Sequence, residues 1–265
     1  MSLLARDGYH LHWEQSGTGS PVLLVMGAVY SSAMWYPALP LLRAHHALVS
    51  FDNQGTGRSS WRPGVSIEDL AADALAVLDA AGLETAHVYG ISLGGVLALE
   101  LARAAPERVR SLVLGCTCVL TPDKPRAPIE VNDALLAASR KDLADSTGYG
   151  SACSPEARAR NHRAILEDTA VPQALVAQQD ALRAYQGSLS DLAALTMPAL
   201  VLHGTEDPIV PVEWGRELAA TLPDSRLVEY EGCGHNYLVE VGDAPTLEVL
   251  GFLAEVDAAQ PVKAL

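Results

Sequence analysis

The five residues at positions 90–94, Gly-Ile-Ser-Leu-Gly, have the types and spacing of a serine nucleophile held on a sharp turn. Such a turn between a strand and a helix brings two backbones so close that only glycine fits two residues before and two after the serine. Gly90 and Gly94 occupy these positions around Ser92. The turn also points the N-terminus of the following helix at the serine, where amide donors can stabilise an oxyanion. The alternative is a glycine-rich turn with an incidental serine.

The segments on either side of this pentapeptide have the composition that the turn requires. The apolar residues 87–89 predict a buried parallel strand before it. The Ala- and Leu-rich residues 93–105 have helical spacing and end at Pro106. These flanking segments favour a catalytic serine over an incidental one.

A serine hydroxyl becomes a nucleophile when a base takes its proton and an acid orients that base. In an open parallel sheet these partners come from loops at the carboxyl ends of the strands. Two later loops, 203–210 and 232–236, follow strand-like runs and offer Asp207 with its neighbour Glu206, and then His235. The residues alone leave Glu206 as an alternative acid. They also leave seven competing histidines, namely His10, His12, His45, His46, His87, His162 and His203.

Apolar runs alternate with amphipathic segments around these loops, which is typical of a parallel, doubly wound sheet. The dipeptide Asp7-Gly8 predicts an antiparallel hairpin at the start of the chain. Strands are predicted at 3–5, 9–14, 22–26, 47–52, 87–89, 111–115, 199–203 and 226–231. Helices are predicted at 34–46 with proline interruptions, and at 66–81, 93–105, 213–221 and 244–256.

The alternation stops between residues 118 and 196, where the pattern indicates helices without strands. These helices are predicted at Asn132–Leu143, Pro155–Leu166, Pro172–Ala184 and Ser190–Leu195. We therefore expect residues 1–117 and 197–265 to form one α/β core, and residues 118–196 to form a helical cap that sets substrate choice.

The pentapeptide, the pattern Gly-x-x-Asp-x-x-x-Pro at 204–211 and the late Gly-x-Gly-His at 232–235 together resemble the α/β-hydrolase fold family. The likeness is to its capped branch, which includes cofactor-free haloperoxidase-like esterases and 3-oxoadipate enol-lactonase-like hydrolases. It covers residues 3–257 and implies a mostly parallel sheet of about eight strands with an inserted helical cap. It also implies that Ser92, Asp207 and His235 are the nucleophile, the orienting acid and the general base. Asp207 is favoured over Glu206 because the family's acid precedes a proline-containing turn.

The resemblance further implies an oxyanion hole built from the backbone N–H groups of Leu93 and Ala28. The loop that carries Ala28 begins Met26-Gly27, where the family has His-Gly. Because the donors are backbone amides, we expect the hole to survive this substitution. The turn at 52–59 resembles the family's Asp-x-Arg-Gly-x-Gly-x-Ser, with Gln54 in place of the arginine.

Composition narrows the remaining classes of function. The 265 residues carry a net charge of −14 without a basic run, which argues against binding nucleic acid or anionic membranes. The four cysteines have neither CxxC nor zinc-ligand spacing, so we expect reduced thiols, no metal and no cofactor. The first residues lack a signal-peptide pattern, and no run reaches the length of a membrane span. We expect a cytoplasmic protein whose partner is a small-molecule substrate.

The expected activity is cleavage of an ester, lactone or similar activated carbonyl of a small, largely apolar substrate through an acyl-enzyme. The alternative is proton-transfer chemistry, as in a lyase, a cyclase or a cofactor-free oxygenase or haloperoxidase, with His235 as base. A binding protein is a third reading, which the triad disfavours. Candidate pocket residues are the aromatic Tyr30, Trp35, Tyr149 and Tyr185, the thiols Cys116, Cys118 and Cys233, and the cap arginines Arg158, Arg160 and Arg163, which otherwise lie on a solvated face.

Overall fold

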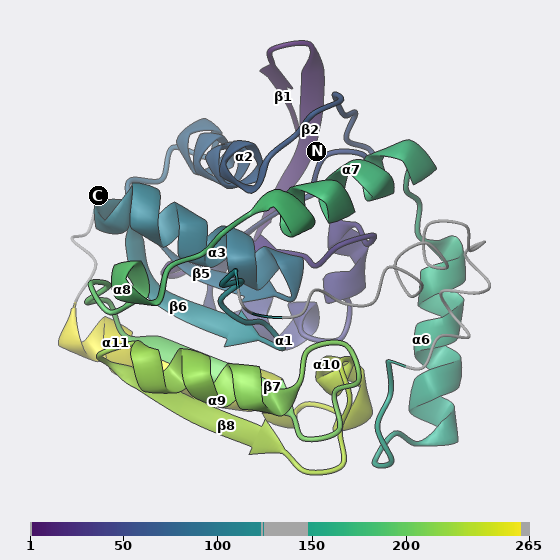
Figure 1. The fold of residues 1–265 in the computed structure, drawn as a ribbon, viewed down its shortest axis with the longest axis vertical. Helices are drawn as coiled ribbons and strands as arrows, with labels where there is room; N and C mark the ends of the chain where they lie inside the picture. The colour runs from purple at the N-terminus through teal and green to yellow at the C-terminus, as the bar shows by residue number, and fades with distance from the viewer. Residues whose placement is uncertain (1, 123, 125–147, 261–265) are drawn as a thin grey trace.

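The computed structural model describes residues 2–122, 124 and 148–260. An eight-stranded sheet lies at the centre of the fold (Figure 1). The strand order is β1-β2-β4-β3-β5-β6-β7-β8. Among the pairings of these eight described strands, only those of β1 with β2 and of β2 with β4 are antiparallel. The predicted fold class, an α/β-hydrolase fold with a mostly parallel sheet, is therefore confirmed. The strands are β1 (Ser2–Arg6), β2 (Tyr9–Ser16), β3 (Pro21–Val25), β4 (Ala47–Phe51), β5 (Ala86–Ile91), β6 (Val109–Gly115), β7 (Ala199–Gly204) and β8 (Ser225–Tyr230).

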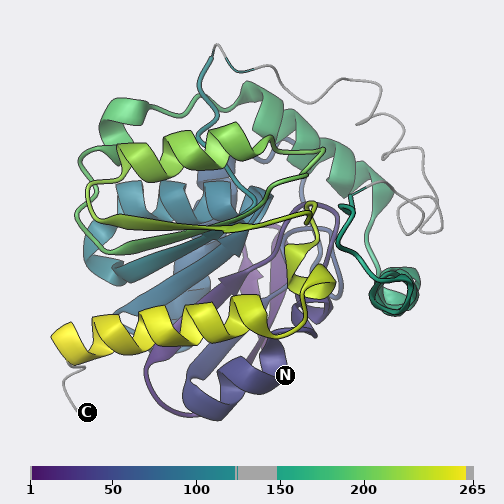
Figure 2. The same ribbon diagram turned by 90° about the horizontal axis from the view of Figure 1, so that it is seen from below.

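Helices cover both faces of the sheet and bury two apolar clusters against it (Figure 2). One face carries α2 (Ile67–Ala80), α3 (Leu93–Ala104) and α9 (Val212–Thr221). The other face carries α1 (Leu39–His45), the short α10 (Tyr237–Glu240) and α11 (Ala244–Ala259). The inner strands β5 and β7 are buried at every residue, as expected for continuous apolar runs in a parallel sheet.

Several element boundaries follow from local turn and cap chemistry. Gly8 has a φ of +80°, and the chain reverses there so that Arg6 pairs with Tyr9 in the predicted hairpin. Ser66 and Asp69 exchange side-chain-to-backbone hydrogen bonds in a capping box at the start of α2.

The helix predicted over 34–46, with interruptions at Pro37 and Pro40, is divided at Pro37 but not at Pro40. Residues Ser32–Trp35 form a 3-10 turn, and α1 begins only at Leu39. Pro37 lies in the break, because proline in a helix interior removes a hydrogen bond and clashes with the preceding turn. Pro40 is accommodated in the first turn of α1, where no intrahelical N–H partner is needed.

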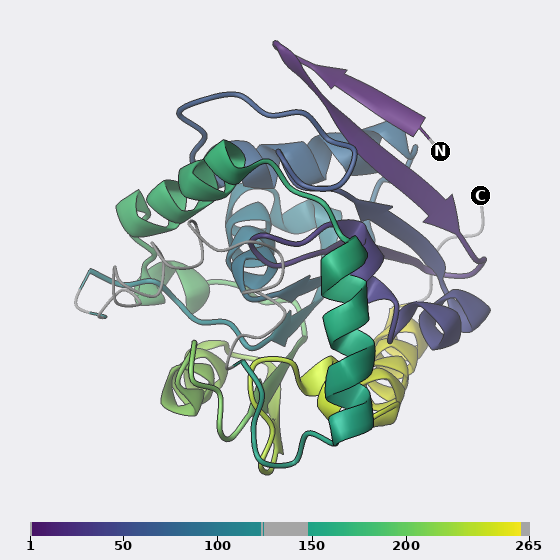
Figure 3. The ribbon, with the colours of Figure 1, turned by 90° about the vertical axis from the view of Figure 1, so that its right-hand side faces the viewer.

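Three helices of the segment between β6 and β7 are described. They are α6 (Pro155–Glu167), α7 (Pro172–Ala184) and α8 (Leu189–Leu192), the last shorter than the predicted 190–195. The predicted helix Asn132–Leu143 lies outside the described residues. Helix α6 contacts α10, and α7 contacts α2. Helices α6 and α7 lie on the side that faces the viewer in Figure 3. None of the helices within the described ranges is long and apolar enough to cross a membrane.

Candidate active site

Ser92 lies on the sharp turn between β5 and α3, with φ 55° and ψ −121°. This conformation is rare for a residue with a side chain, and such strain persists where the surroundings impose it. A Cβ on Gly90 would overlap the carbonyl oxygen of Gly94, and a Cβ on Gly94 would overlap that of Val25. Both glycines are therefore required by backbone contact, as the pentapeptide pattern predicts.

Residues at the end of β6 bond both the N–H and the C=O group of Ser92. The Ser92 amide donates to the carbonyl of Gly115 at 2.8 Å. The hydroxyl of Thr117 donates to the Ser92 carbonyl, also at 2.8 Å. These two bonds anchor the backbone of Ser92 to the end of β6 and leave its hydroxyl free to point into the adjacent cavity.

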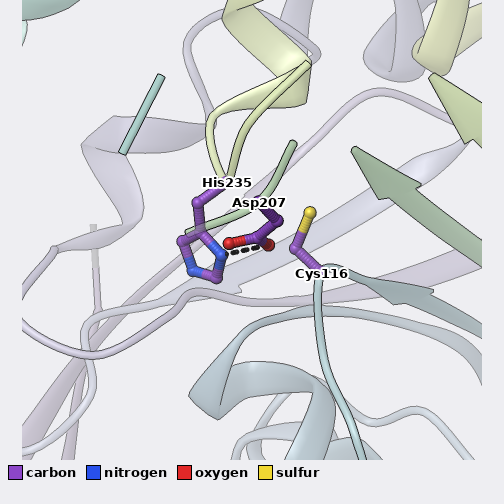
Figure 4. A group of neighbouring side chains, drawn as sticks. All are labelled: Cys116, Asp207 and His235. Carbon is purple, nitrogen blue, oxygen red and sulfur yellow. Dashed lines mark hydrogen bonds and ion pairs between the residues drawn. The ribbon is translucent and has the colours of Figure 1, made fainter. Parts of the chain in front are cut away.

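Asp207 and His235 follow β7 and β8 and meet beside this turn. His235 Nδ1 lies 2.7 Å from Asp207 Oδ2 (Figure 4). The other carboxylate oxygen, Oδ1, accepts the amides of Ile209 at 2.8 Å and Val210 at 2.9 Å. With Asp207 ionised, Nδ1 carries the proton, so Nε2 is the nitrogen that can accept one. The aspartate is buried, with 7 % of its surface exposed.

The electrostatics of this pair suit a base that is held by an anion. Burial of the imidazole lowers its pKa, but the charge of Asp207 and their hydrogen bond outweigh this and raise the pKa of His235. For Asp207, burial raises the pKa, and the His235 charge, their hydrogen bond and the two loop amides lower it below the usual value. The carboxylate therefore stays ionised next to the imidazole.

The alternative acid Glu206 points away from the histidine. Its exposed carboxylate accepts the amide and the hydroxyl of Ser151, at 2.7 and 2.8 Å. Among the competing histidines, His203 is buried beneath the pair, and its Nε2 bonds the carbonyl of Val210 at 2.8 Å. Of the eight histidines, only His235 lines the cavity beside Ser92 in the described part of the chain.

Two backbone amides next to Ser92 match the predicted oxyanion hole. A Cβ on Gly27 would lie 3.2 Å from the Cβ of Ser92, so the loop after β3 passes directly beside Ser92. Ala28 follows in that loop, and Leu93 is the first residue of α3. Within the described ranges, neither the Ala28 nor the Leu93 amide donates a hydrogen bond, so both are available to an oxyanion.

Side chains that sequence reasoning missed hold this oxyanion loop in place. Asn53 Nδ2 donates to the carbonyl of Met26 at 2.9 Å. The Val29 amide donates to Gln178 of α7 at 3.3 Å. The Asp168 carboxylate, after α6, accepts the amide of Ser31 at 2.9 Å. The sequence pointed only to Asn53, which lies in the family-like turn at 52–59. Gln178 and Asp168 are distant in sequence from the loop that they contact, so no motif marks them.

The substitution at Gln54 has a direct structural explanation. Its amide donates to the buried Asp73 at 2.7 Å, where an arginine would have supplied a positive charge. Arg6 of the N-terminal hairpin donates to the same carboxylate at 3.0 Å. The chain therefore pairs Asp73 with a cation from β1 in place of one from the turn.

Ser92 and His235 line one cavity of about 80 Å³. In the described part of the chain, no hydrogen bond joins their side chains, and such catalytic bonds often tighten only when a ligand binds. The remaining described lining is mostly apolar, and it includes Met34, Ile91 and Leu238. None of the described lining residues is Asp, Glu, Lys or Arg.

The other predicted pocket residues divide between cavity wall and packing. Tyr30 lines the cavity, whereas Trp35 is buried edge-on against Tyr89, with ring centroids 4.7 Å apart. Tyr185 bonds Glu100 on another part of the core. The guanidinium of Arg158 stacks over the Tyr149 ring, 5.0 Å from its centroid.

The three cap arginines Arg158, Arg160 and Arg163 do not line this cavity in the described part of the chain. The thiols of Cys116, Cys118 and Cys233 are buried in the core. Cys116 nevertheless lies beside the Asp207–His235 pair, with ligand-type atoms of the three residues within 4.8 Å of one another (Figure 4).

An open, mostly parallel sheet with a serine on a strand-to-helix turn and an Asp–His pair at the same edge defines the class of α/β hydrolases. The chain belongs to the alpha/beta hydrolase family, whose sequence model matches residues 22–250. The family predicted from the sequence motifs is therefore confirmed.

Individual relatives agree in fold and differ in named activity. A protein of Azorhizobium caulinodans, provisionally named carbamate hydrolase RutD, is 32% identical over 93% of this chain and 96% of its own length. A non-heme haloperoxidase of Rhodococcus erythropolis is 28% identical over 94% of this chain and 97% of its own. The structure of a thermophilic esterase from Thermogutta terrifontis superposes with a TM-score of 0.82 at 27% identity, covering 94% of each chain.

Proposed function

We propose that this protein is a serine hydrolase that cleaves a small, neutral ester or a similar activated carbonyl through an acyl-enzyme. One observation carries the proposal: the cavity beside Ser92 is also lined by His235, whose opposite ring nitrogen is bonded to the buried Asp207. A ligand-binding protein needs neither a base nor an acid that orients it.

In the acylation step, the proton of Ser92 Oγ moves to Nε2 of His235 while Oγ forms a bond to the carbonyl carbon. The carbonyl oxygen becomes negative and accepts the amides of Ala28 and Leu93. The bond to the leaving group then breaks, and the leaving oxygen takes the proton from Nε2. The charge of Asp207 stabilises the imidazolium that exists between these two transfers.

In the deacylation step, a water molecule gives a proton to Nε2 of His235 and its oxygen attacks the acyl carbon. The same two amides accept the charge of the second tetrahedral intermediate. Collapse breaks the bond to Ser92 Oγ, which takes back the proton from Nε2. The free acid leaves, and the enzyme returns to its starting state.

The cavity supports a small, uncharged acyl group as the substrate part that binds beside Ser92. Its described lining is mostly apolar and includes no Asp, Glu, Lys or Arg. The names of the relatives agree with acyl chemistry on small molecules, since they include an esterase and a proposed carbamate hydrolase.

A second candidate is proton-transfer chemistry with His235 as base and Ser92 only as a hydrogen-bond donor. The similarity to a non-heme haloperoxidase favours it, because that name denotes a reaction other than hydrolysis. The turn at Ser92 opposes it, because a strained backbone and two obligatory glycines exceed what a simple hydrogen-bond donor requires.

The variants Ser92→Ala and His235→Ala separate the two candidates, measured on p-nitrophenyl acetate and, once identified, on the native substrate. If Ser92 is the nucleophile, each variant loses turnover by a similar large factor and the double variant is hardly worse, because the two residues act as one unit. If the reaction is proton transfer, Ser92→Ala loses only about tenfold on the native substrate, the equivalent of one hydrogen bond. That outcome overturns the proposal.

A further inference from the structure

One buried carboxylate bridges the loop of His235 and a segment of the cap. Glu240 ends the four-residue helix α10, which begins two residues after His235, and only 7 % of its surface is exposed. Both of its carboxylate oxygens accept the amide of Gly234, at 3.1 and 3.0 Å. Oε2 also accepts the amide of Gly150, at 2.9 Å. A single side chain thus joins the residue directly before His235 to residues 148–152, which precede α6.

The two segments joined by Glu240 touch through their backbones. A Cβ on Gly150 would overlap the carbonyl oxygen of Gly232, and a Cβ on Gly234 would lie 2.6 Å from the amide nitrogen of Gly150. The Ala152 amide donates to the Gly232 carbonyl at 2.8 Å. Glycine at these positions lets the two backbones lie in direct contact, and a hydrogen bond joins them. The position of the His235 loop is therefore coupled to the position of residues 148–152.

Among the described residues, no cation forms an ion pair with Glu240, and its hydrogen-bond partners are backbone N–H groups. Burial raises the pKa of Glu240, and the hydrogen bonds from backbone N–H groups oppose this shift. Because both oxygens accept amides, the geometry fits the ionised carboxylate. Among the described residues, the other titratable groups that act on Glu240 or His235 include Asp207, His203 and the thiols of Cys116, Cys153 and Cys233. Burial lowers the pKa of His235, whereas the charges of Asp207 and Glu240 both raise it.

We propose that Glu240 is a positioning residue for the general base: its carboxylate locks the His235 loop to the cap segment 148–152 and places a second negative charge near the imidazole. This inference rests on the proposed role of His235 as the base. Glu240 is a second buried carboxylate near His235, in addition to Asp207. It also connects the position of the base to the cap segment 148–152.

Three variants separate the two effects, with the rate of Ser92 modification by an alkyl fluorophosphonate and p-nitrophenyl acetate hydrolysis measured from pH 5 to 9. Glu240→Gln removes the charge and turns an amide donor toward a backbone N–H. Glu240→Asp keeps the charge but is one methylene too short to bond both loops. Glu100→Gln is the matched control, because Glu100 is equally buried yet pairs with Arg103 of the same helix.

We expect Glu240→Gln to lose about tenfold or more in both rates and to move the acid limb of the pH profile to lower pH. Glu240→Asp should lose rate as well but keep the acid limb near its wild-type position. Glu100→Gln should change neither quantity. Wild-type rates and an unmoved acid limb in a folded Glu240→Gln would overturn the inference, as would failure of both Glu240 variants to fold, since Glu240 would then be merely structural.

The wild-type protein in the same series distinguishes this inference from the proposed function. If fluorophosphonate does not modify Ser92 in the wild type, the serine hydrolase itself is refuted, and the Glu240 inference falls with it. If the wild type is modified with an acid limb that the Glu240 variants leave unchanged, only the inference about Glu240 is wrong.

Discussion

The substitution Asp207→Asn tests the orienting acid most sharply, because the structure dictates how the new side chain must lie. Oδ1 of Asp207 accepts the amides of Ile209 and Val210, and Oδ2 meets Nδ1 of His235. An asparagine at this position keeps its carbonyl oxygen on the two amides and turns its NH₂ toward the imidazole. Nδ1 must then accept a hydrogen bond from this NH₂, so the hydrogen of the neutral ring moves to Nε2. This tautomer cannot take the proton of Ser92.

The size of the effect follows from the cost of restoring the working tautomer. Placing Nδ1–H against the asparagine N–H leaves two buried donors unsatisfied, at about 1–3 kcal/mol each. The imidazolium also loses a charge-assisted hydrogen bond, worth about 1.5–3 kcal/mol. These contributions sum to about 3.5–9 kcal/mol and overlap in part, so we take the lower half of the range: about 4–6 kcal/mol corresponds to a fall in kcat of about 10³–10⁴-fold. The fold should persist, because the carbonyl oxygen of asparagine still accepts both loop amides.

The assay is steady-state hydrolysis of p-nitrophenyl acetate, with circular dichroism to verify the fold. Glu206→Gln is the companion variant, because this exposed neighbour bonds Ser151 and not the histidine, so it should lose far less rate than Asp207→Asn. A near-normal Asp207→Asn combined with an inactive Glu206→Gln would show that the acid has been assigned to the wrong residue.

Three further predictions follow from the same structure. First, kcat/KM for a neutral ester should rise with pH through a midpoint above the ordinary histidine pKa of about 6.5. The reason is that Asp207 raises the pKa of His235, and only the neutral ring accepts a proton. A flat profile from about pH 5 to 9 would contradict this. Second, burial lowers the pKa of His87 to about 4, so the unfolded state binds the proton more readily, and the unfolding free energy in urea should fall as pH drops from 6.5 to 4, by on the order of 3 kcal/mol. A stability unchanged over this range would show that His87 is not buried as a neutral group. Third, Gly94→Ala should lower the unfolding free energy by about 2 kcal/mol, because the new methyl meets the Val25 carbonyl, whereas Gly251→Ala in α11, with open space around it, should raise it by about 1 kcal/mol; equal effects would refute the close approach at the turn.

Local patterns were sufficient to predict most elements of the fold. Helix α7 has the predicted bounds Pro172–Ala184, because a proline in its first turn and an apolar stripe mark it clearly. The capping box at Ser66 and the apolar runs of the inner strands are equally local signals. The interruption predicted at Pro37 is present between Trp35 and Leu39, whereas the one predicted at Pro40 is wrong, because the first turn of a helix accommodates proline.

The residues of the candidate site could be predicted from the sequence only where a family motif or the order of the loops indicates them. The motifs single out Ser92, Asp207 and His235, and the structure places them at one edge of the sheet, while their catalytic roles stay predictions. The supporting residues carry no such mark. Gln178 contacts the oxyanion loop from 149 positions away, and the four-residue helix that ends in Glu240 is too short to show a helical period. Such contacts depend on tertiary packing.

The central claim is that Ser92 is an activated nucleophile, and covalent labelling followed by peptide mapping tests it most directly. The protein is treated with an alkyl fluorophosphonate, its intact mass is measured, and the modified peptide is sequenced by mass spectrometry. The account predicts one adduct, on Ser92, formed rapidly in the wild type and slowly or not at all in His235→Ala, because the imidazole must remove the serine proton. An unmodified wild-type protein, or an adduct on another residue, would contradict it.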